Sequence, residues 1–349
     1  MLADSVIETE PGLGAVANLD RATRLAHGLL NGEHSGSGGA DGAHANDGRK
    51  GAGRAERKGG GPASSDAHHA TSHGPLVAVG ACTFGIPFAT GVALSPAIRG
   101  WDELPLLASL EEAFGVPVTL VTDVKAAAAA EMCRGALVGA NPALYLNLGT
   151  GLAVAIVHDG KVMTGAHGAS GEIGYNLRSA ADLGLAADHE GRAVLLEDVV
   201  SGMGIARSVA RLNGKAASPA APASPASAAG LGGAADVFDR ALADPIYEKV
   251  LEEFLRELCY HLVNLTIAVD PERIAVGGGM VRSWEVLEPA LRVALDAHVP
   301  YPPELVVGTF PYDAALRGAL DSGLELARRS TGQPGSTGQD SPDRRERQP

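Results

Sequence analysis

Two glycine-rich segments of this sequence have residue types and a spacing that suit the binding of a substrate or cofactor. Gly149-Thr150-Gly151 separates two apolar runs, and Gly277-Gly278-Gly279 follows a third. Glycines let a backbone approach a ligand closely, and successive N–H groups form a cradle suited to a phosphate. The second triplet also precedes a predicted helix, whose amino end favours anions. Each triplet by itself is equally compatible with a plain turn, so both interpretations stay open at this point.

Three acidic residues could act on a substrate beside these loops. Asp123 follows the apolar run 118–121 and precedes an alanine-rich run at 125–133. It either caps the helix that follows or accepts a proton from a substrate hydroxyl. An ordinary carboxylate suffices for the second role in phosphoryl transfer, because the transition state is loose. Glu172 and Glu197 are candidate acceptors for the hydroxyl groups of a sugar, or else surface carboxylates.

The elements that must position these residues follow an α/β pattern. Apolar spacing predicts helices at 15–31, 105–114, 125–133, 205–212 and 246–268, another after Gly279, and a last one at 314–327. Short apolar runs predict strands at 76–80, 118–121, 144–148, 153–158, 161–163, 273–276 and 305–307. Gly85 and Pro87 predict a loop that ends near Trp101. A strand, an acid and a helix in succession form a unit whose ligands bind beyond the carboxyl ends of the strands.

Composition separates the foldable part from three other segments. Of the 349 residues, 45% are hydrophobic, but the segments 33–74, 214–235 and 329–349 are polar or of low complexity. Such segments bury too little apolar surface to fold, so we expect two insertions and a disordered tail. The net charge of −13 disfavours nucleic acid as a partner. The basic cluster at 49–58 is interpreted as a solvated tether.

Cysteine usage and hydropathy indicate the compartment. Cys82, Cys133 and Cys259 are few, odd in number and far apart, which predicts no disulfide framework and no zinc site of the Cys–Cys type. The first thirty residues lack the pattern of a secretory signal, and no apolar run reaches the ~20 residues of a membrane helix. We therefore expect a soluble, cytoplasmic protein without a membrane partner.

Taken in order, several motifs resemble the ROK family of sugar kinases and sugar-responsive repressors. They are GVPVTLVTDVKAAAAAEMCRGA, LYLNLGTGLAVAIVHDGKVMTGAHGASGEIGY, LEDVVSG and NLTIAVDPERIAVGGGMV, together with SPAIRGW and Leu104-Pro105-Leu106. The similarity covers roughly residues 76–328 apart from the second insertion. Several motifs in one order are far more specific than any one of them.

The resemblance implies an α/β fold of the actin-like ATPase (ribonuclease H-like) type, with two lobes. The smaller lobe would be residues 1–121 and the larger lobe 122–312, and the helix 313–328 would return to the smaller lobe. Asp123 matches the catalytic base, and Thr122, Glu172, Tyr175 and Glu197 occupy positions that face the sugar. The phosphates and adenosine of ATP would lie on Gly149, Thr150, Gly151, Gly277, Gly278 and Gly279, with Mg²⁺. Family members are often homodimers or homotetramers.

The sequence also departs from the family pattern. Thr122 stands where the family has Asn, which puts sugar selectivity in doubt because a hydroxyl replaces an amide. Tyr175 stands where zinc-binding members have His, and the stretch 188–195 has no Cys, so we expect a zinc-free member in which the Tyr175 hydroxyl could replace a sugar contact. Ala153 and Ala155 replace glycines. No Asp-x-Gly-Gly-Thr phosphate segment precedes Val16, which predicts an incomplete first lobe with an open sheet edge.

Three functions therefore compete. The first is an ATP-dependent kinase of a hexose or N-acetylhexosamine, glucokinase-like. The second is a catalytically inactive sugar-binding or regulatory protein, although residues 1–75 contain no basic, helix-turn-helix-like segment. The third is a truncated product that does not fold stably.

Overall fold

The computed structural model describes residues 5–7, 9–31, 75–183, 195–212, 234–241 and 243–330. The chain divides into two compact units, one made of residues 1–8 and 19–75 and the other of residues 9–18 and 76–349. Helix α1 (Gly14–Leu30) contributes residues to both, and most of it belongs to the first unit. All further elements belong to the second unit. The predicted insertion at 33–74 lies outside the described residues.

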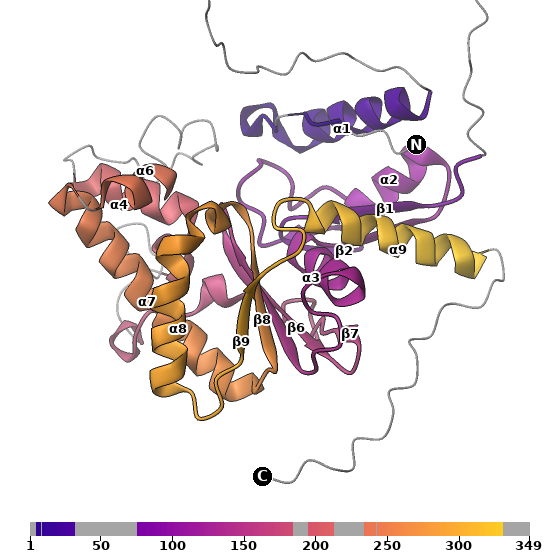
Figure 1. Ribbon diagram of the computed structural model, residues 1–349. Coiled ribbons are helices and arrows are strands. Elements are labelled where there is room, and N and C mark those ends of the chain that lie inside the picture. The colour runs from indigo at the N-terminus through magenta and orange to yellow at the C-terminus, as the bar shows by residue number, and fades with distance from the viewer. Residues whose placement is uncertain are drawn as a thin grey trace, which may run out of the picture. The chain divides into compact units, whose positions relative to one another are not determined.

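A mixed five-stranded sheet forms the centre of the second unit, in the order β7-β6-β5-β8-β9. Strands β5, β6 and β7 form an antiparallel meander, and β8 and β9 extend it in parallel with β5 (Figure 1). The strands are β5 (Ala143–Leu148), β6 (Leu152–His158), β7 (Lys161–Val162), β8 (Arg273–Gly277) and β9 (Glu304–Val307). The parallel strands end at the same edge of the sheet, where both glycine triplets begin.

Side chains of β5 alternate between two different cores, as the period of a strand requires. Leu144, Leu146 and Leu148 are fully buried in a large aliphatic core. That core is shared with α4 (Gly202–Leu212), α6 (Ala234–Arg240), α7 (Pro245–Val269) and α8 (Trp284–His298). Tyr145 points to the opposite face, where small alanines allow α3 (Asp123–Arg134) to pack closely. Figure 1 shows α7 and α8 on one side of the sheet and α3 on the other.

A second, two-stranded parallel sheet carries the predicted catalytic acid. β1 (Val79–Thr83) pairs with β4 (Val118–Thr122), so that Thr83 lies opposite Thr122. Helix α2 (Leu106–Phe114) precedes β4, and the last helix α9 (Ala314–Ser330) contacts β1, β4 and α3. Small residues make this contact possible. A Cβ on Gly318 would lie 1.8 Å from the Ala126 carbonyl oxygen, and a Cβ on Gly80 would lie 1.8 Å from that of Ala319.

The structure corrects four predictions about elements. The strand predicted at 76–80 lies at 79–83 instead. Pairing with β4, and not the apolar run, sets the bounds of this strand. The loop predicted after Gly85 contains the antiparallel hairpin β2 (Ile86–Phe88) and β3 (Gly91–Ala93). Pro87 is tolerated there because a two-stranded hairpin has a free edge. Residues 234–235, assigned to the second insertion, begin α6, and residues 329–330, assigned to the tail, end α9.

Other predicted elements lie within a few residues of the observed ones, and short 3₁₀ turns complete the chain. The turns are η1 (Pro11–Leu13), η2 (Ile173–Tyr175), η3 (Ala180–Asp182), η4 (Leu196–Asp198) and η5 (Gly279–Ser283). No helix of the described residues is both long enough and apolar enough to span a membrane. The lobe boundaries at 121 and 312 stay predictions.

A buried carboxylate fixes the carboxyl end of α3 to the segment that leads into α9. The Glu131 side chain is fully buried. It accepts hydrogen bonds from the backbone N–H groups of Ala136 at 2.7 Å, Thr309 at 3.0 Å and Phe310 at 2.7 Å. Gly135 and Gly308 leave room for it, since a Cβ on either would lie within 2.8 Å of a Glu131 oxygen.

We expect Glu131→Gln to lower the free energy of unfolding by about 2–3 kcal/mol, because an amide NH₂ cannot accept the hydrogen bonds of two oxygens and leaves a buried N–H without a partner. Urea unfolding would measure the difference. The exposed Glu285→Gln on α8 is the matched control and should stay close to the unmodified chain. Equal stability of the two variants would contradict this account of Glu131.

Candidate active site

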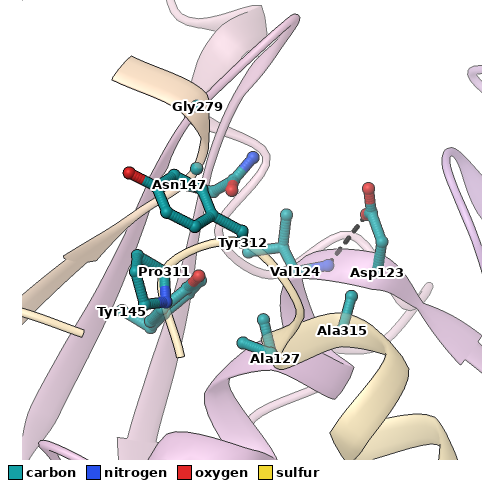
Figure 2. Close-up of a pocket in the computed structure, with 11 residues that line it drawn as sticks. Asp123, Val124, Ala127, Tyr145, Asn147, Gly279, Pro311, Tyr312 and Ala315 are labelled. Atoms are coloured by element: carbon teal, nitrogen blue, oxygen red, sulfur yellow. Dashed lines mark hydrogen bonds between the residues drawn. The ribbon is translucent and has the colours of Figure 1, made fainter. Parts of the chain in front are cut away.

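A cavity of about 220 Å³ opens where α3 meets the carboxyl edge of the central sheet. Four segments line it: the start of α3, strand β5, the loop after β8, and residues 311–315, where the chain enters α9. Figure 2 shows Asp123 on one side of the cavity, with Asn147 and Tyr312 across from it. The lining residues are Asp123, Val124, Ala127, Tyr145, Asn147, Gly278, Gly279, Pro311, Tyr312, Ala314 and Ala315.

Asp123 is the first residue of α3 and borders the cavity. The residue that caps the helix is Thr122, whose hydroxyl accepts a hydrogen bond from the Lys125 N–H at 3.4 Å. The carboxylate of Asp123 accepts from the adjacent Val124 N–H at 2.8 Å. Burial raises the pKa of Asp123, while that hydrogen bond and the nearby Lys125 ammonium oppose the increase. Thr122 thus provides the cap, and the carboxylate of Asp123 binds an N–H group of the same turn while Asp123 also lines the cavity.

Thr122 is a poorer candidate for a sugar contact than its position suggests. Its side chain is only 5% exposed, and its hydroxyl is already the acceptor for the first turn of α3. The Lys125 Nζ atom lies 3.5 Å from the same oxygen. Contact between Thr122 and a substrate therefore stays a prediction.

The loop Gly149-Thr150-Gly151 forms a tight turn that is bonded to the start of α4. The Gly149 N–H donates to the Gly151 carbonyl at 3.1 Å, so one predicted phosphate donor is used within the loop. The carbonyls of Gly149 and Thr150 accept from Gly202 N–H at 2.9 Å and Met203 N–H at 3.4 Å. None of the three loop residues lines the cavity.

Glu197 contacts this loop rather than the cavity. It accepts the Leu152 N–H at 2.9 Å, and a Cβ on Gly151 would lie 2.7 Å from the same carboxylate oxygen. Glycine at 151 is therefore explained by the approach of Glu197. Contact between Glu197 and a sugar hydroxyl therefore stays a prediction.

Glu172 directly precedes the turn η2, and Tyr175 is the last residue of that turn. Gly171 holds this segment against β6, since a Cβ there would lie 1.7 Å from the Val154 carbonyl oxygen. The pKa of Glu172 is raised by burial and by the charges of Asp123 and Glu197, and Lys125 opposes this. The charge of Asp123 therefore contributes to the raised pKa of Glu172. Tyr175 is 44% exposed.

The three glycines at the end of β8 differ in what surrounds them. A Cβ on Gly277 would lie 2.0 Å from the Tyr145 hydroxyl, so its role is packing. Gly278 has φ +90°, and its N–H donates to the Pro311 carbonyl at 2.9 Å. Gly279 has open space beside its Cα. A phosphate or ribose could therefore approach the backbone at Gly279, which together with Gly278 lines the cavity.

Several residues of the site escaped the sequence analysis. Asn147 lies in the cavity wall, and an amide inside the apolar strand LYLNL was the available signal. Tyr312 had no such signal, because the fold alone brings its segment to the site.

We expect Asp123→Asn to raise the melting temperature at pH 7. Folding raises the pKa of Asp123, so the folded state bears a cost when this group is ionised. That cost is complete above the folded-state pKa and disappears below the ordinary pKa of 3.8. The advantage of Asn should therefore shrink as the pH falls, when followed by thermal unfolding between pH 4 and 8. The exposed Asp296→Asn should show no such trend, and an equal trend in both would contradict the prediction.

The chain resembles known proteins in both sequence and structure. A glucokinase from Halalkalibacterium halodurans is 31% identical over 232 residues, which span 66% of this chain and 69% of that protein. The structure of a ROK family glucokinase from Streptomyces griseus, in complex with glucose and AMPPNP, matches with a TM-score of 0.57 and 26% identity, over 73% of this chain and 84% of that one.

A ROK family transcriptional regulator, a homologue of the E. coli MLC protein, matches with a TM-score of 0.53 and 25% identity, over 70% of this chain and 63% of that one. The expected mixed α/β fold of the actin-like ATPase type is thereby confirmed. The family model described as "ROK family" matches residues 67–321. This chain belongs to the ROK family, which includes ATP-dependent sugar kinases.

Proposed function

We propose that this protein transfers the γ-phosphoryl group of ATP to a hydroxyl of a hexose or N-acetylhexosamine. One observation carries the proposal: the Asp123 carboxylate and the glycine backbone at 278–279 line the same cavity. A proton acceptor and a phosphate-binding backbone must be adjacent for phosphoryl transfer, because catalysis consists mainly of positioning and charge stabilisation. The glucokinase relative supports a sugar as the acceptor.

In this reaction Asp123 accepts the proton of the attacking sugar hydroxyl. The sugar oxygen forms a bond to the γ-phosphorus as the bond to the β–γ bridging oxygen breaks, and ADP leaves with that electron pair. Burial strengthens Asp123 as a base, since its pKa is raised. Glu172, Glu197, Tyr175 and Thr122 are proposed to orient the sugar, with Glu172 favoured because its charge couples to that of Asp123.

The chain is suited to ATP with its magnesium ion. Gly279 leaves its backbone open to a ligand, and Asn147 offers an amide beside it. Gly149, Thr150 and Gly151 are proposed to approach the phosphates from the neighbouring loop. Mg²⁺ commonly binds through phosphate oxygens and water with few protein ligands. The described residues contain no group of three or more His, Cys, Asp or Glu that could hold an ion. When bound, Mg²⁺ would neutralise charge on the phosphates.

The remaining expectations belong to the same proposal. We propose a cytoplasmic, homodimeric or homotetrameric enzyme that does not bind nucleic acid and needs no structural zinc. Tyr175 supports the last point, because a phenol is not the His that zinc-binding members have. Most of the stretch 188–195, which lacks Cys, lies outside the described residues.

A regulatory alternative is supported by the similarity to the ROK transcriptional regulator. In that case the protein would bind sugar without turning over ATP. Asp123 would then have no proton to accept, and its replacement would leave sugar binding intact.

We expect Asp123→Asn to lower kcat at least ~100-fold, as loss of a general base commonly does. ADP release with Mg-ATP and a panel of hexoses and N-acetylhexosamines would measure it, with Asp296→Asn as control. In the unmodified enzyme, kcat/KM should fall on the acid side with an apparent pKa above 3.8, because the pKa of Asp123 is raised. A folded protein that binds sugar but releases no ADP would instead favour the regulatory function.

We expect the melting temperature to be the same before and after treatment with a zinc chelator. A structural zinc site stabilises the folded state directly, so its removal would lower the melting temperature. Metal analysis of the purified protein gives an independent measurement. About one zinc ion per chain, together with a lowered melting temperature, would overturn the zinc-free proposal.

A further inference from the structure

Arg178 connects the segment after η2 to the long helix α7. Its Nη2 atom donates to a carboxylate oxygen of Glu253 at 2.7 Å and to one of Glu257 at 3.1 Å. The two acids stand four residues apart on the same face of α7, and the Glu257 side chain is only 13% exposed. Because solvent and salt screen a partly buried ion pair less than an exposed one, this forked contact is stronger than a surface pair.

A second contact lies one turn further along the same face of α7. The Asn176 side-chain nitrogen Nδ2 lies 3.3 Å from Nδ1 of His261, which is buried. His261 stands four residues after Glu257, so all three partners on α7 share one face of the helix. Asn176 and Arg178 therefore attach the chain directly after η2 to α7 at two points.

The backbone of the same segment also holds the turn η4. The Asn176 carbonyl accepts the Leu196 N–H at 2.9 Å, and Leu177 pairs with Leu195 in an isolated antiparallel bridge. Glu197 is the next residue along η4. Residues 176–178 thus connect α7 with both turns, so a shift of this segment would move η2 and η4 together.

The other end of η2 is anchored to β6. The Gly171 carbonyl accepts the Val154 N–H at 2.8 Å, and a Cβ on Gly171 would lie 1.7 Å from the Val154 carbonyl oxygen. Between the two anchors, η2 is closed by two backbone hydrogen bonds of 3.1 and 2.9 Å. A turn that is fixed at both ends has little freedom to shift, and this one holds Glu172 and Tyr175.

We propose that Arg178 is a positioning residue of the sugar site, because its forked ion pair with α7 fixes the turns η2 and η4. Those turns place Glu172, Tyr175 and Glu197. The inference rests on the proposed kinase function, which assigns these three side chains to the sugar. Arg178 acts through them and does not itself touch the sugar. A purely structural ion pair would contribute to stability and leave sugar affinity unchanged.

The test compares Arg178→Met with Arg256→Met. The Arg256 guanidinium lies 3.5 Å from the same Glu257 carboxylate, but it belongs to α7 itself and its side chain is 67% exposed. We expect Arg178→Met to raise the sugar KM and the Kd of glucose at least ~10-fold, because small misplacements of binding groups are costly. The KM for Mg-ATP should change far less. Arg256→Met should match the unmodified protein in both constants.

Hydrogen–deuterium exchange of the whole chain reads the position of the two turns directly, without any sugar. The backbone amides of residues 172–177 and 195–198 should exchange faster in Arg178→Met, while those of β8 stay as protected as before. Arg256→Met should show neither change. Calorimetric titration with glucose, below the melting transition of each variant, then relates the loosening of the turns to the Kd.

A double variant keeps the test decisive if Arg178→Met folds poorly. Removal of Arg178 alone leaves two neighbouring carboxylates on α7 without their shared cation, which destabilises the fold. Adding Glu257→Gln removes one of these charges, so the double variant should melt at a higher temperature than Arg178→Met. Its Kd for glucose should nevertheless stay raised, and the effects of the two substitutions on the Kd should not add, because both remove one contact.

The outcomes separate this inference from the proposed function. Unchanged exchange at 172–177 in Arg178→Met would overturn the role of Arg178, and so would faster exchange with an unchanged Kd and sugar KM. Additive effects of Arg178→Met and Glu257→Gln on the Kd would also contradict it. Glucose binding without ADP release by the unmodified protein would overturn the kinase function alone, since the Kd values would still report on Arg178.

Discussion

The site depends on a single buried carboxylate, that of Glu131. Its two oxygens accept three backbone N–H groups from two segments that are far apart in sequence, and no solvent competes for them. The segment held in this way, 308–310, continues into Pro311, whose carbonyl accepts the Gly278 N–H. Asp123 is at the opposite end of the same helix. These hydrogen bonds therefore also fix the position of Asp123 relative to the glycine backbone across the cavity. A charged acceptor is suited to this task because such hydrogen bonds are stronger than neutral ones.

Helix α3 therefore carries two buried charged side chains, one near each end, and their surroundings differ. At its carboxyl end, backbone donors satisfy Glu131 completely, so the charge serves the fold. At its amino end, Lys125 stands in the first turn, where the helix dipole disfavours a positive charge, and its Nζ lies 3.5 Å from the Thr122 hydroxyl. Close packing of α3 through alanines and of α9 through Gly318 leaves little room for either end to shift.

Glycines in this chain illustrate why a motif alone does not assign a role. Gly277 is required by the Tyr145 hydroxyl, Gly151 by the Glu197 carboxylate and Gly278 by its positive φ. Only Gly279 of the second triplet leaves open space for a ligand. In the same way Thr122 provides the N-cap of α3, which weakens it as a sugar ligand, while Asp123 accepts the Val124 N–H in the same turn, so both interpretations of Asp123 stay open.

The sequence by itself determined the α/β pattern, most helices and strands, and the family, because local periodicity and ordered motifs are properties of the chain alone. The catalytic role of Asp123 stays a prediction. The tertiary structure decided the register of β1, the hairpin around Pro87 and the composition of the cavity. Strand pairing at Val79 and Val118 overrides the apolar run, and Asn147 and Tyr312 gain meaning only from neighbours distant in sequence. The neighbours of a side chain are set by the fold, so no spacing of residues could reveal that Asn147 and Tyr312 line the same cavity as Asp123.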